Sequence, residues 1–228
     1  MRLSIVIPAF NEEQNIAATL AHLQAARARG CEVIVIDGGS ADRTAETAKP
    51  WVDKVVNSAR GRATQMNAGA LAATGDALLF LHADSIAPPD ADQLILGALQ
   101  SGARHWGRFD VAIEGRHFFL PVISWFINRR SRLSGIATGD QGLFMTRDAF
   151  TAAGGFPAIP LMEDVAMCKA LKKNGAPLCL KQKIVTSGRR WEKHGVWRTI
   201  LLMWRMRLAF SLGADPVALH RAYYGSRQ

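Results

Sequence analysis

The stretch "LLFLHADS" (residues 78–85) places a histidine and an aspartate directly after a run of four apolar residues. A short apolar run of this kind is typical of a buried strand. The same arrangement occurs twice upstream, where "LSIVI" (3–7) precedes "PAFNEE" and "EVIVID" (32–37) precedes "GGS". The sequence therefore predicts three buried strands that each end in polar residues.

Helix-like segments separate these strands. Ile16, Leu20 and Leu23 recur at helical spacing, an alanine-rich segment covers residues 61–75, and Pro88 opens a further helical pattern. Alternation of strands and helices predicts an α/β fold with a mostly parallel central sheet flanked by helices. Because ligands bind beyond the carboxyl ends of the strands in such sheets, the polar residues after the three strands mark one candidate crevice.

The pattern changes in the second half of the chain. "GRFDVAIEG" (107–115) alternates as an antiparallel strand does, and "GLFMT" (142–146) reads as a short strand. Helical patterns begin at Arg147 and near Glu163, and a last one covers residues 196–212.

Length and composition fit one globular domain. The 228 residues suffice for a single α/β domain with a full core, and we expect one domain over residues 1–228. Three cysteines without a CxxC pair indicate neither a disulfide framework nor a structural zinc site. The N-terminus "MRLSIVIPAF" lacks the apolar core and cleavage site of a signal peptide. We therefore expect a cytoplasmic protein, with contact at the inner face of the cell membrane left open.

Charge is distributed unevenly. Residues 1–103 hold 8 Lys and Arg against 11 Asp and Glu, whereas residues 104–228 hold 20 against 8, and the net charge is +9. A basic C-terminal half suits nucleic acid, an anionic membrane surface or a phosphorylated substrate. Charge alone does not decide among them.

Two aspartates at strand ends are candidates for ligand binding. Asp84 suits Mg²⁺ or Mn²⁺, which take one or two protein carboxylates and complete their shell with phosphate oxygens and water. A structural role, in which the Asp84 carboxylate caps the turn before Pro88, explains its presence equally well. Asp37 precedes two glycines that permit close approach of a ligand, although "DGGS" is also an ordinary turn. No GxGxxG follows the first strand and no GxxxxGK[ST] occurs, which disfavours dehydrogenases and P-loop ATPases.

Taken together and in order, the motifs resemble the family 2 glycosyltransferases of the GT-A fold. A His-Ala-Asp third motif and the segment "SGRRWEKHGVW" (187–197) are similar to a bacterial branch of that family. The segments that carry the resemblance are "IVIPAFNEEQNI" (5–16), "VIVIDGGSADRT" (33–44), "GRATQMNAGA" (61–70), "FLHADS" (80–85), "TGDQGLFMTRDAF" (138–150) and "LMEDVAMCKAL" (161–171).

The resemblance implies a nucleotide-binding half at residues 1–103 and an acceptor-binding half at 104–228. Asp37 would contact the base, and Arg62 would help to hold the nucleotide. The nucleotide base pocket would be lined by Pro8, Ala9 and Glu12.

Asp84 matches the metal-binding aspartate of the family's DxD motif, which implies Mn²⁺ or Mg²⁺ as cofactor. His82 stands at the first position of that motif, where an imidazole would hydrogen-bond a hydroxyl or assist the metal. Asp164 matches the catalytic base, and Glu163 would contact the acceptor or orient its neighbour. Without the earlier motifs, these two acids would read as charges that complement a helix dipole.

The remaining implied contacts involve the donor sugar, the diphosphate and the acceptor. Asp140 and Gln141 would approach the donor sugar or the acceptor, although a turn before a strand explains them too. Arg189 and Arg190 fit a diphosphate clamp, and Trp191 fits an aromatic platform for a sugar. A solvated basic loop is the alternative for this segment.

Two apolar stretches raise the question of membrane contact. The ten residues "FFLPVISWFI" (118–127) are half of the roughly 20 that a spanning helix needs. Core packing is the commoner explanation for an apolar helical stripe, but tryptophans flanked by arginines also suit a helix lying on anionic lipid. The second stretch, at residues 196–212, carries such a stripe in Trp197, Ile200, Leu201, Trp204 and Leu208.

The sequence thus favours a metal-dependent, inverting glycosyltransferase that moves a sugar from a nucleotide diphosphate donor to a hydroxyl or lipid-phosphate acceptor, with UDP favoured by the resemblance. A nucleotidyltransferase is the nearest enzymatic alternative, although its usual glycine- and lysine-rich first loop is missing from "PAFNEEQN". A basic nucleic-acid-binding or membrane-binding module without catalysis is the alternative of another class. We expect no nucleic-acid partner, because that module would leave the acids at the strand ends unexplained.

Overall fold

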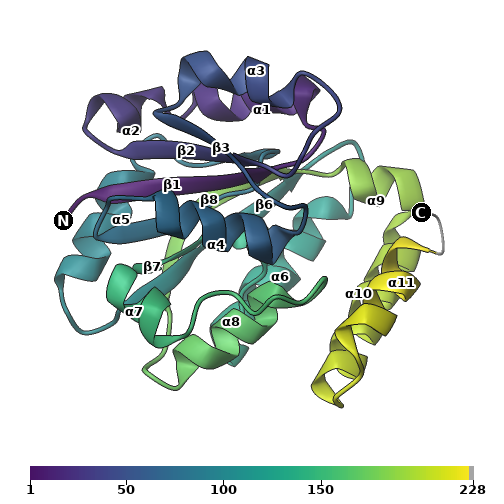
Figure 1. The fold of residues 1–228 in the computed structure, drawn as a ribbon. Coiled ribbons are helices and arrows are strands. Elements are labelled where there is room, and N and C mark those ends of the chain that lie inside the picture. The colour runs from purple at the N-terminus through teal and green to yellow at the C-terminus, as the bar shows by residue number, and fades with distance from the viewer. Residues whose placement is uncertain (226–228) are drawn as a thin grey trace.

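A computed structural model describes residues 1–225, apart from the side chains of Arg190, His194 and Tyr224. Its centre is an eight-stranded sheet in the order β3-β2-β1-β4-β7-β6-β8-β5 (Figure 1). The strands are β1 (Leu3–Ala9), β2 (Glu32–Asp37), β3 (Lys54–Asn57), β4 (Ala77–Phe80), β5 (Ser85–Ile86), β6 (Trp106–Glu114), β7 (Leu143–Thr146) and β8 (Leu178–Ser187).

Helices connect and cover these strands, and two short 3-10 helices accompany them. The helices are α1 (Glu13–Ala21), α2 (Gln24–Ala28), α3 (Thr44–Ala48), η1 (Lys49–Trp51), α4 (Arg62–Ala72), α5 (Ala91–Gln100), α6 (Leu120–Ser134), η2 (Gly139–Gln141), α7 (Arg147–Ala152), α8 (Glu163–Lys172), α9 (Arg189–His194), α10 (Val196–Ser211) and α11 (Pro216–Tyr224). The single helical pattern of Ile16, Leu20 and Leu23 is divided, because α1 ends at Ala21 and α2 begins at Gln24.

The predicted α/β fold with its mostly parallel sheet is confirmed. Strands β3, β2, β1 and β4 are parallel, and Ala9 of β1 lies opposite Asp37 of β2. The polar residues that follow these strands are therefore brought to one edge of the sheet. Strand β7 joins β4 in the antiparallel direction, and β6 pairs antiparallel with β7 but parallel with β8. The expectation that β6 is antiparallel thus holds on one of its sides.

The sheet is buried on both faces because alternate side chains along each strand enter different apolar clusters. Ile5 and Ile7 of β1 join the cluster that α1 and α5 complete, whereas Val6 joins the one that α4 and α8 complete. Helix α4 lies very close to the sheet, since a Cβ atom on Gly69 would lie 2.2 Å from Val6 Cγ1. Side chains on both faces therefore hold the strand ends in fixed positions.

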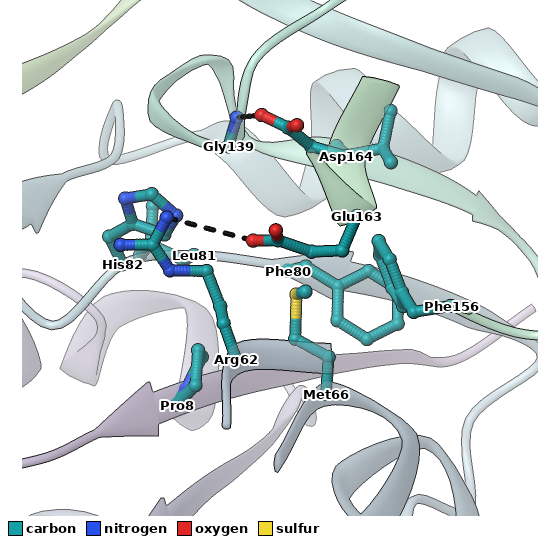
Figure 2. A pocket seen from close by; sticks show the side chains of 11 residues that line it. Pro8, Arg62, Met66, Phe80, Leu81, His82, Gly139, Phe156, Glu163 and Asp164 are labelled. Atoms are coloured by element: carbon teal, nitrogen blue, oxygen red, sulfur yellow. Dashed lines mark hydrogen bonds and ion pairs between the residues drawn. The ribbon is translucent and has the colours of Figure 1, made fainter. Parts of the chain in front are cut away.

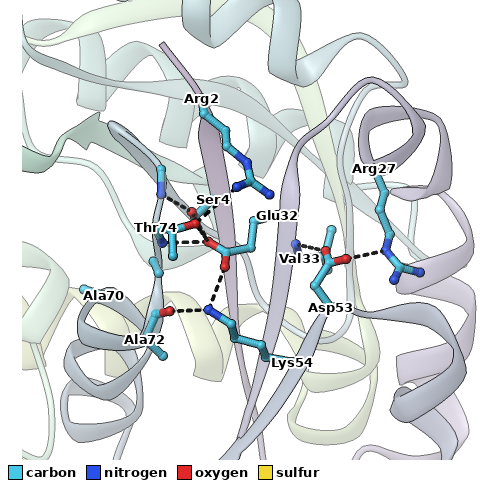
Figure 3. A network of polar contacts seen from close by, with 12 residues as sticks. Arg2, Ser4, Arg27, Glu32, Val33, Asp53, Lys54, Ala70, Ala72 and Thr74 are labelled. Carbon is cyan, nitrogen blue, oxygen red and sulfur yellow. Dashed lines mark hydrogen bonds and ion pairs between the residues drawn. The ribbon is translucent and has the colours of Figure 1, made fainter.

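A buried carboxylate ties the amino ends of the parallel strands together, at the edge opposite the candidate crevice (Figure 3). Glu32 accepts hydrogen bonds from Ser4 Oγ at 2.6 Å, Lys54 Nζ at 2.9 Å and the Thr74 backbone N–H at 2.7 Å. Burial by itself would raise the pKa of Glu32, but these bonds outweigh it and lower the pKa to about 2.

Replacement of Glu32 by glutamine is expected to cost roughly 3 kcal/mol of unfolding free energy at pH 7, because it leaves buried donors without a charged acceptor. The folded-state pKa lies below the unfolded one, so this stabilisation is present above pH ~4.3 and is lost as pH falls toward 2. Urea unfolding should show a difference between wild type and variant at pH 7 that falls to about half at pH 3, because the folded carboxyl is still largely ionised one unit above its pKa of about 2. Glu46→Gln, on the exposed side of α3, is the control and should change stability by less than about 0.5 kcal/mol. Equal differences at both pH values would contradict the assignment.

The C-terminal helices α10 and α11 lie side by side at one end of the molecule, beyond α9 (Figure 1). The core-packing explanation for the apolar stripe of α10 is wrong for most of its members. Trp197, Leu201, Trp204 and Leu208 are between 62% and 73% exposed, and only Ile200 packs against a buried cluster. No helix among residues 1–225 combines the length and the apolar character that crossing a bilayer requires.

Candidate active site

A cavity of about 720 Å³ opens at the carboxyl ends of β1 and β4. It brings together segments from both halves of the chain, including the loop after β1, the start of α4, the loop after β4, the start of α8 and the end of β8. The residues predicted for the site that line this cavity are Pro8, Ala9, Glu12, Arg62, His82, Asp84, Asp140, Glu163, Asp164, Arg189 and Trp191.

Glu163 and Asp164 begin α8 and turn toward different partners (Figure 2). Asp164 Oδ2 accepts a hydrogen bond of 2.9 Å from the Gly139 backbone N–H, and Oδ1 accepts one of 2.7 Å from Val165. Glu163 Oε1 lies 3.6 Å from Arg62 Nη1 of α4. The two backbone bonds fix the orientation of the Asp164 carboxylate in the cavity wall.

Burial shifts the titration of both acids. Loss of solvent raises the pKa of Asp164, against the lowering effect of its two backbone hydrogen bonds. Burial also raises the pKa of Glu163, the nearby Asp164 charge adds to that rise, and Arg62 opposes it. A carboxylate whose pKa is raised is a stronger proton acceptor, which suits a general base.

His82 is held against the loop that precedes β7. Its Nδ1 lies 3.1 Å from Asp140 Oδ1, and a Cβ atom on Gly139 would lie 2.4 Å from its Nε2. Only glycine leaves room for the ring at residue 139. The imidazole and the Asp140 carboxylate therefore form a pair in the cavity wall, which brings the histidine of "HAD" next to the aspartate of "TGDQ".

The guanidinium group of Arg189 lies between the carboxylates of Glu12 and Asp84. Arg189 Nη2 lies 3.3 Å from Glu12 Oε2 and 3.4 Å from Asp84 Oδ2. The guanidinium shows that this corner attracts positive charge. Among the described residues, no cluster of three or more potential protein ligands could hold a metal alone. Asp84 fits a divalent ion in the way Mg²⁺ and Mn²⁺ are usually held with a nucleotide, by one or two carboxylates plus phosphate oxygens.

Two predicted residues, Asp37 and Gln141, are placed apart from the lining. Asp37 is 5% exposed, and its carboxylate accepts hydrogen bonds from the Gly39 and Ser40 backbone N–H groups and from the Ser40 hydroxyl. Gln141 is fully buried, and its amide donates to Ser131 Oγ at 3.0 Å. In this structure the two side chains shape neighbouring loops. The side chain of Arg190 lies outside the described residues.

Trp191 lines the cavity but is only 8% exposed, because its indole packs with Ile113 and Leu120. Most of the ring is therefore covered by protein, which leaves little surface for stacking on a sugar. The indole anchors α9, the helix that also carries Arg189.

The structure adds residues that the sequence analysis did not identify. Gln65 donates hydrogen bonds of 2.8 and 2.9 Å to the Ala9 and Ile36 carbonyls and lines the cavity from α4. Arg207 and Met203 reach the cavity from α10. The sequence signal that could have identified them is their helical spacing, which places them on the side of the helix away from the tryptophans.

Comparison with known proteins supports the motif-based resemblance. The family model described as glycosyl transferase family 2 matches residues 4–153. A dolichol-phosphate mannosyltransferase from Pyrococcus furiosus is 27% identical over 168 residues, which cover 70% of this chain and 46% of that protein. A poly-beta-1,6-N-acetyl-D-glucosamine synthase from Staphylococcus aureus is 25% identical over 221 residues, which cover 86% of this chain and 53% of that protein. The chain thus spans about half the length of these curated relatives.

Solved glycosyltransferases share the fold. A mannosyltransferase from Pyrobaculum calidifontis, solved with GDP-Man and Mn²⁺, superposes with a TM-score of 0.67 at 18% identity, covering 99% of this chain and 64% of that one. A glucosyl-3-phosphoglycerate synthase from Mycobacterium tuberculosis, solved with Mn²⁺, UDP and its product, gives a TM-score of 0.63 at 20% identity, covering 93% and 80%. The fold is the GT-A fold, and because the family model matches most of the chain, this protein belongs to glycosyl transferase family 2.

Proposed function

We propose that this chain is an inverting, metal-dependent glycosyltransferase that moves a sugar from a nucleotide diphosphate donor, with UDP favoured, to a hydroxyl or lipid-phosphate acceptor. The observation that carries the proposal is that Asp84 and Asp164 line one cavity together with Arg62 and Arg189. That cavity therefore combines a carboxylate for a cation, a proton acceptor and two guanidinium groups suited to phosphate.

Asp164 is the proposed general base. Its hydrogen bonds to Gly139 and Val165 orient the carboxylate, and its raised pKa makes it a better proton acceptor. In an inverting reaction it would take the proton of the acceptor hydroxyl while that oxygen attacks the anomeric carbon from the side opposite the leaving diphosphate. Glu163 would orient Arg62 rather than exchange a proton itself.

The leaving diphosphate would be held by two arginine side chains that enter the cavity from different helices. Arg62 comes from α4, and Arg189 comes from α9, where it would exchange its contacts with Glu12 and Asp84 for phosphate oxygens. Asp84 would hold Mn²⁺ or Mg²⁺, which when bound stabilises the negative charge that develops on the diphosphate. The nucleotide base would lie near Pro8, Ala9 and Asp37.

A thermal-shift panel tests this proposal. UDP, GDP and their sugar derivatives are each added at about 100 times the expected Kd, with and without MnCl₂. Ligand binding of that strength stabilises by about 2.7 kcal/mol, which corresponds to a rise in Tm of roughly 5–10 °C for a chain of this size. We expect that rise with one nucleotide and Mn²⁺ together, and glycosidic transfer to water or an added acceptor by the same mixture.

The outcomes separate the candidate functions. Flat responses to every nucleotide diphosphate, together with affinity for polyanions that falls steeply with salt, would replace the enzyme with a basic binding module. Stabilisation by nucleoside triphosphates and release of pyrophosphate would favour a nucleotidyltransferase.

A further inference from the structure

Helix α10 presents two different faces. Met203, Met206 and Arg207 line the cavity, and Leu202 and Phe210 pack with the cluster that includes α11 residue Leu219. The opposite side carries a stripe at helical spacing whose side chains are mostly exposed. The members of this stripe, which we call the tryptophan face, are Trp197, Leu201, Trp204, Leu208 and Leu212, each between 62% and 79% exposed.

The tryptophan face continues beyond α10 at its amino end. The rings of Trp197 and Phe119 lie 5.2 Å apart, and Phe119 contacts Phe118 at 5.0 Å, whose side chain is 79% exposed. The exposed apolar surface therefore runs from the segment before α6 along the whole of α10. Large exposed aromatic and aliphatic side chains in such a row are unusual for a surface that faces water alone.

Positive charge accompanies this face. Arg198 and Arg205 are exposed and stand one position after Trp197 and Trp204, so they border the stripe along one side. Helix α10 holds no aspartate or glutamate, and its third arginine, Arg207, lines the cavity instead. The border of the tryptophan face thus complements an anionic surface.

We propose that the tryptophan face docks on an anionic lipid bilayer, with α10 lying in the plane of the headgroups. Tryptophan and leucine would enter the boundary between headgroups and acyl chains, while Arg198 and Arg205 would pair with lipid phosphates. A second copy of the chain is disfavoured as the occupant, because a two-fold contact through this face would bring the arginines of both copies together.

Docking through this helix would bring the cavity to the membrane. Because α10 walls the cavity with Met203, Met206 and Arg207, its outer face and the cavity are separated only by the thickness of one helix. An acceptor held in the bilayer would then reach Asp164 without leaving the lipid. This consequence rests on the proposed glycosyl transfer, whereas the docking itself does not.

Co-sedimentation with vesicles tests the docking. The whole chain is mixed with phosphatidylcholine vesicles that contain 30% or 0% phosphatidylglycerol, at low and at high NaCl. We expect binding to the anionic vesicles at low salt, with the partition coefficient falling about tenfold or more at high salt or without the anionic lipid. Leu201→Gln/Trp204→Gln and Arg198→Glu/Arg205→Glu should each lower that coefficient by about tenfold or more.

Matched substitutions elsewhere serve as controls. Leu71→Gln repeats the leucine change on α4, where Leu71 is 87% exposed, and Lys49→Glu/Lys173→Glu repeats the charge reversal away from α10. These controls should bind vesicles as wild type does, and every variant should keep its nucleotide-dependent thermal shift, which separates this test from that of the catalytic proposal. The docking proposal is overturned if wild type stays in the supernatant with anionic vesicles, if Leu201→Gln/Trp204→Gln sediments like wild type, or if light scattering shows a stable dimer that this variant abolishes.

Discussion

Replacement of Asp164 by asparagine is expected to lower kcat for sugar transfer by about 10³-fold or more, because the amide cannot accept the proton of the acceptor hydroxyl. The side chain keeps its shape, and the oxygen of the new amide can still accept the Gly139 hydrogen bond, whereas its nitrogen cannot accept the one from Val165. Binding of the nucleotide sugar should therefore stay within about threefold of wild type. Turnover with a saturating donor, and the thermal shift given by donor with Mn²⁺, measure the two quantities separately.

Two further variants show whether the effect belongs to this carboxylate. Glu163→Gln removes the charge beside Arg62 and should reduce turnover less than Asp164→Asn does. Asp148→Asn, on the exposed side of α7, should leave turnover unchanged. If Asp164→Asn retains wild-type turnover, the proton acceptor lies elsewhere in the cavity.

Substitution of Asp84 by alanine is expected to remove the metal-dependent part of donor binding. It leaves the diphosphate without the carboxylate that would hold the cation, and affinity in the presence of Mn²⁺ should fall by about 100-fold. Calorimetric titration of the nucleotide sugar with and without MnCl₂ measures this loss. The variant should respond alike in both conditions.

Asp90→Ala is the matched control, since Asp90 is an exposed carboxylate six residues further along the segment between β4 and α5. It should keep the full response to Mn²⁺. A full Mn²⁺ response in Asp84→Ala would assign the cation to other ligands, and equal loss in both variants would point to damage of the loop rather than of a metal site.

Local patterns were sufficient for β1, β2, β4, β6 and β7, whereas β5 and β8 were not predicted. The apolar runs of β1, β2 and β4 are continuous because both faces of a parallel sheet are covered, and the polar residues that follow mark the strand ends. The order of the motifs along the chain then indicated the fold, and most of the site residues that it indicated line the cavity. These features depend on residues close together in sequence, or on a motif order that the chain itself displays.

Contacts between distant segments were beyond the reach of such patterns. Some contacts depend on loops that meet only after the sheet has formed. Examples are the pairing of His82 with Asp140 and the position of Arg189 between Glu12 and Asp84. The burial of Gln141 has the same origin. The stripe on α10 shows the same limit. Periodicity predicts that a helix has an apolar side but not what that side faces, because burial depends on the neighbours that the whole fold supplies. In α10 these neighbours cover the side that carries Met203 and Met206 and leave Trp204 exposed.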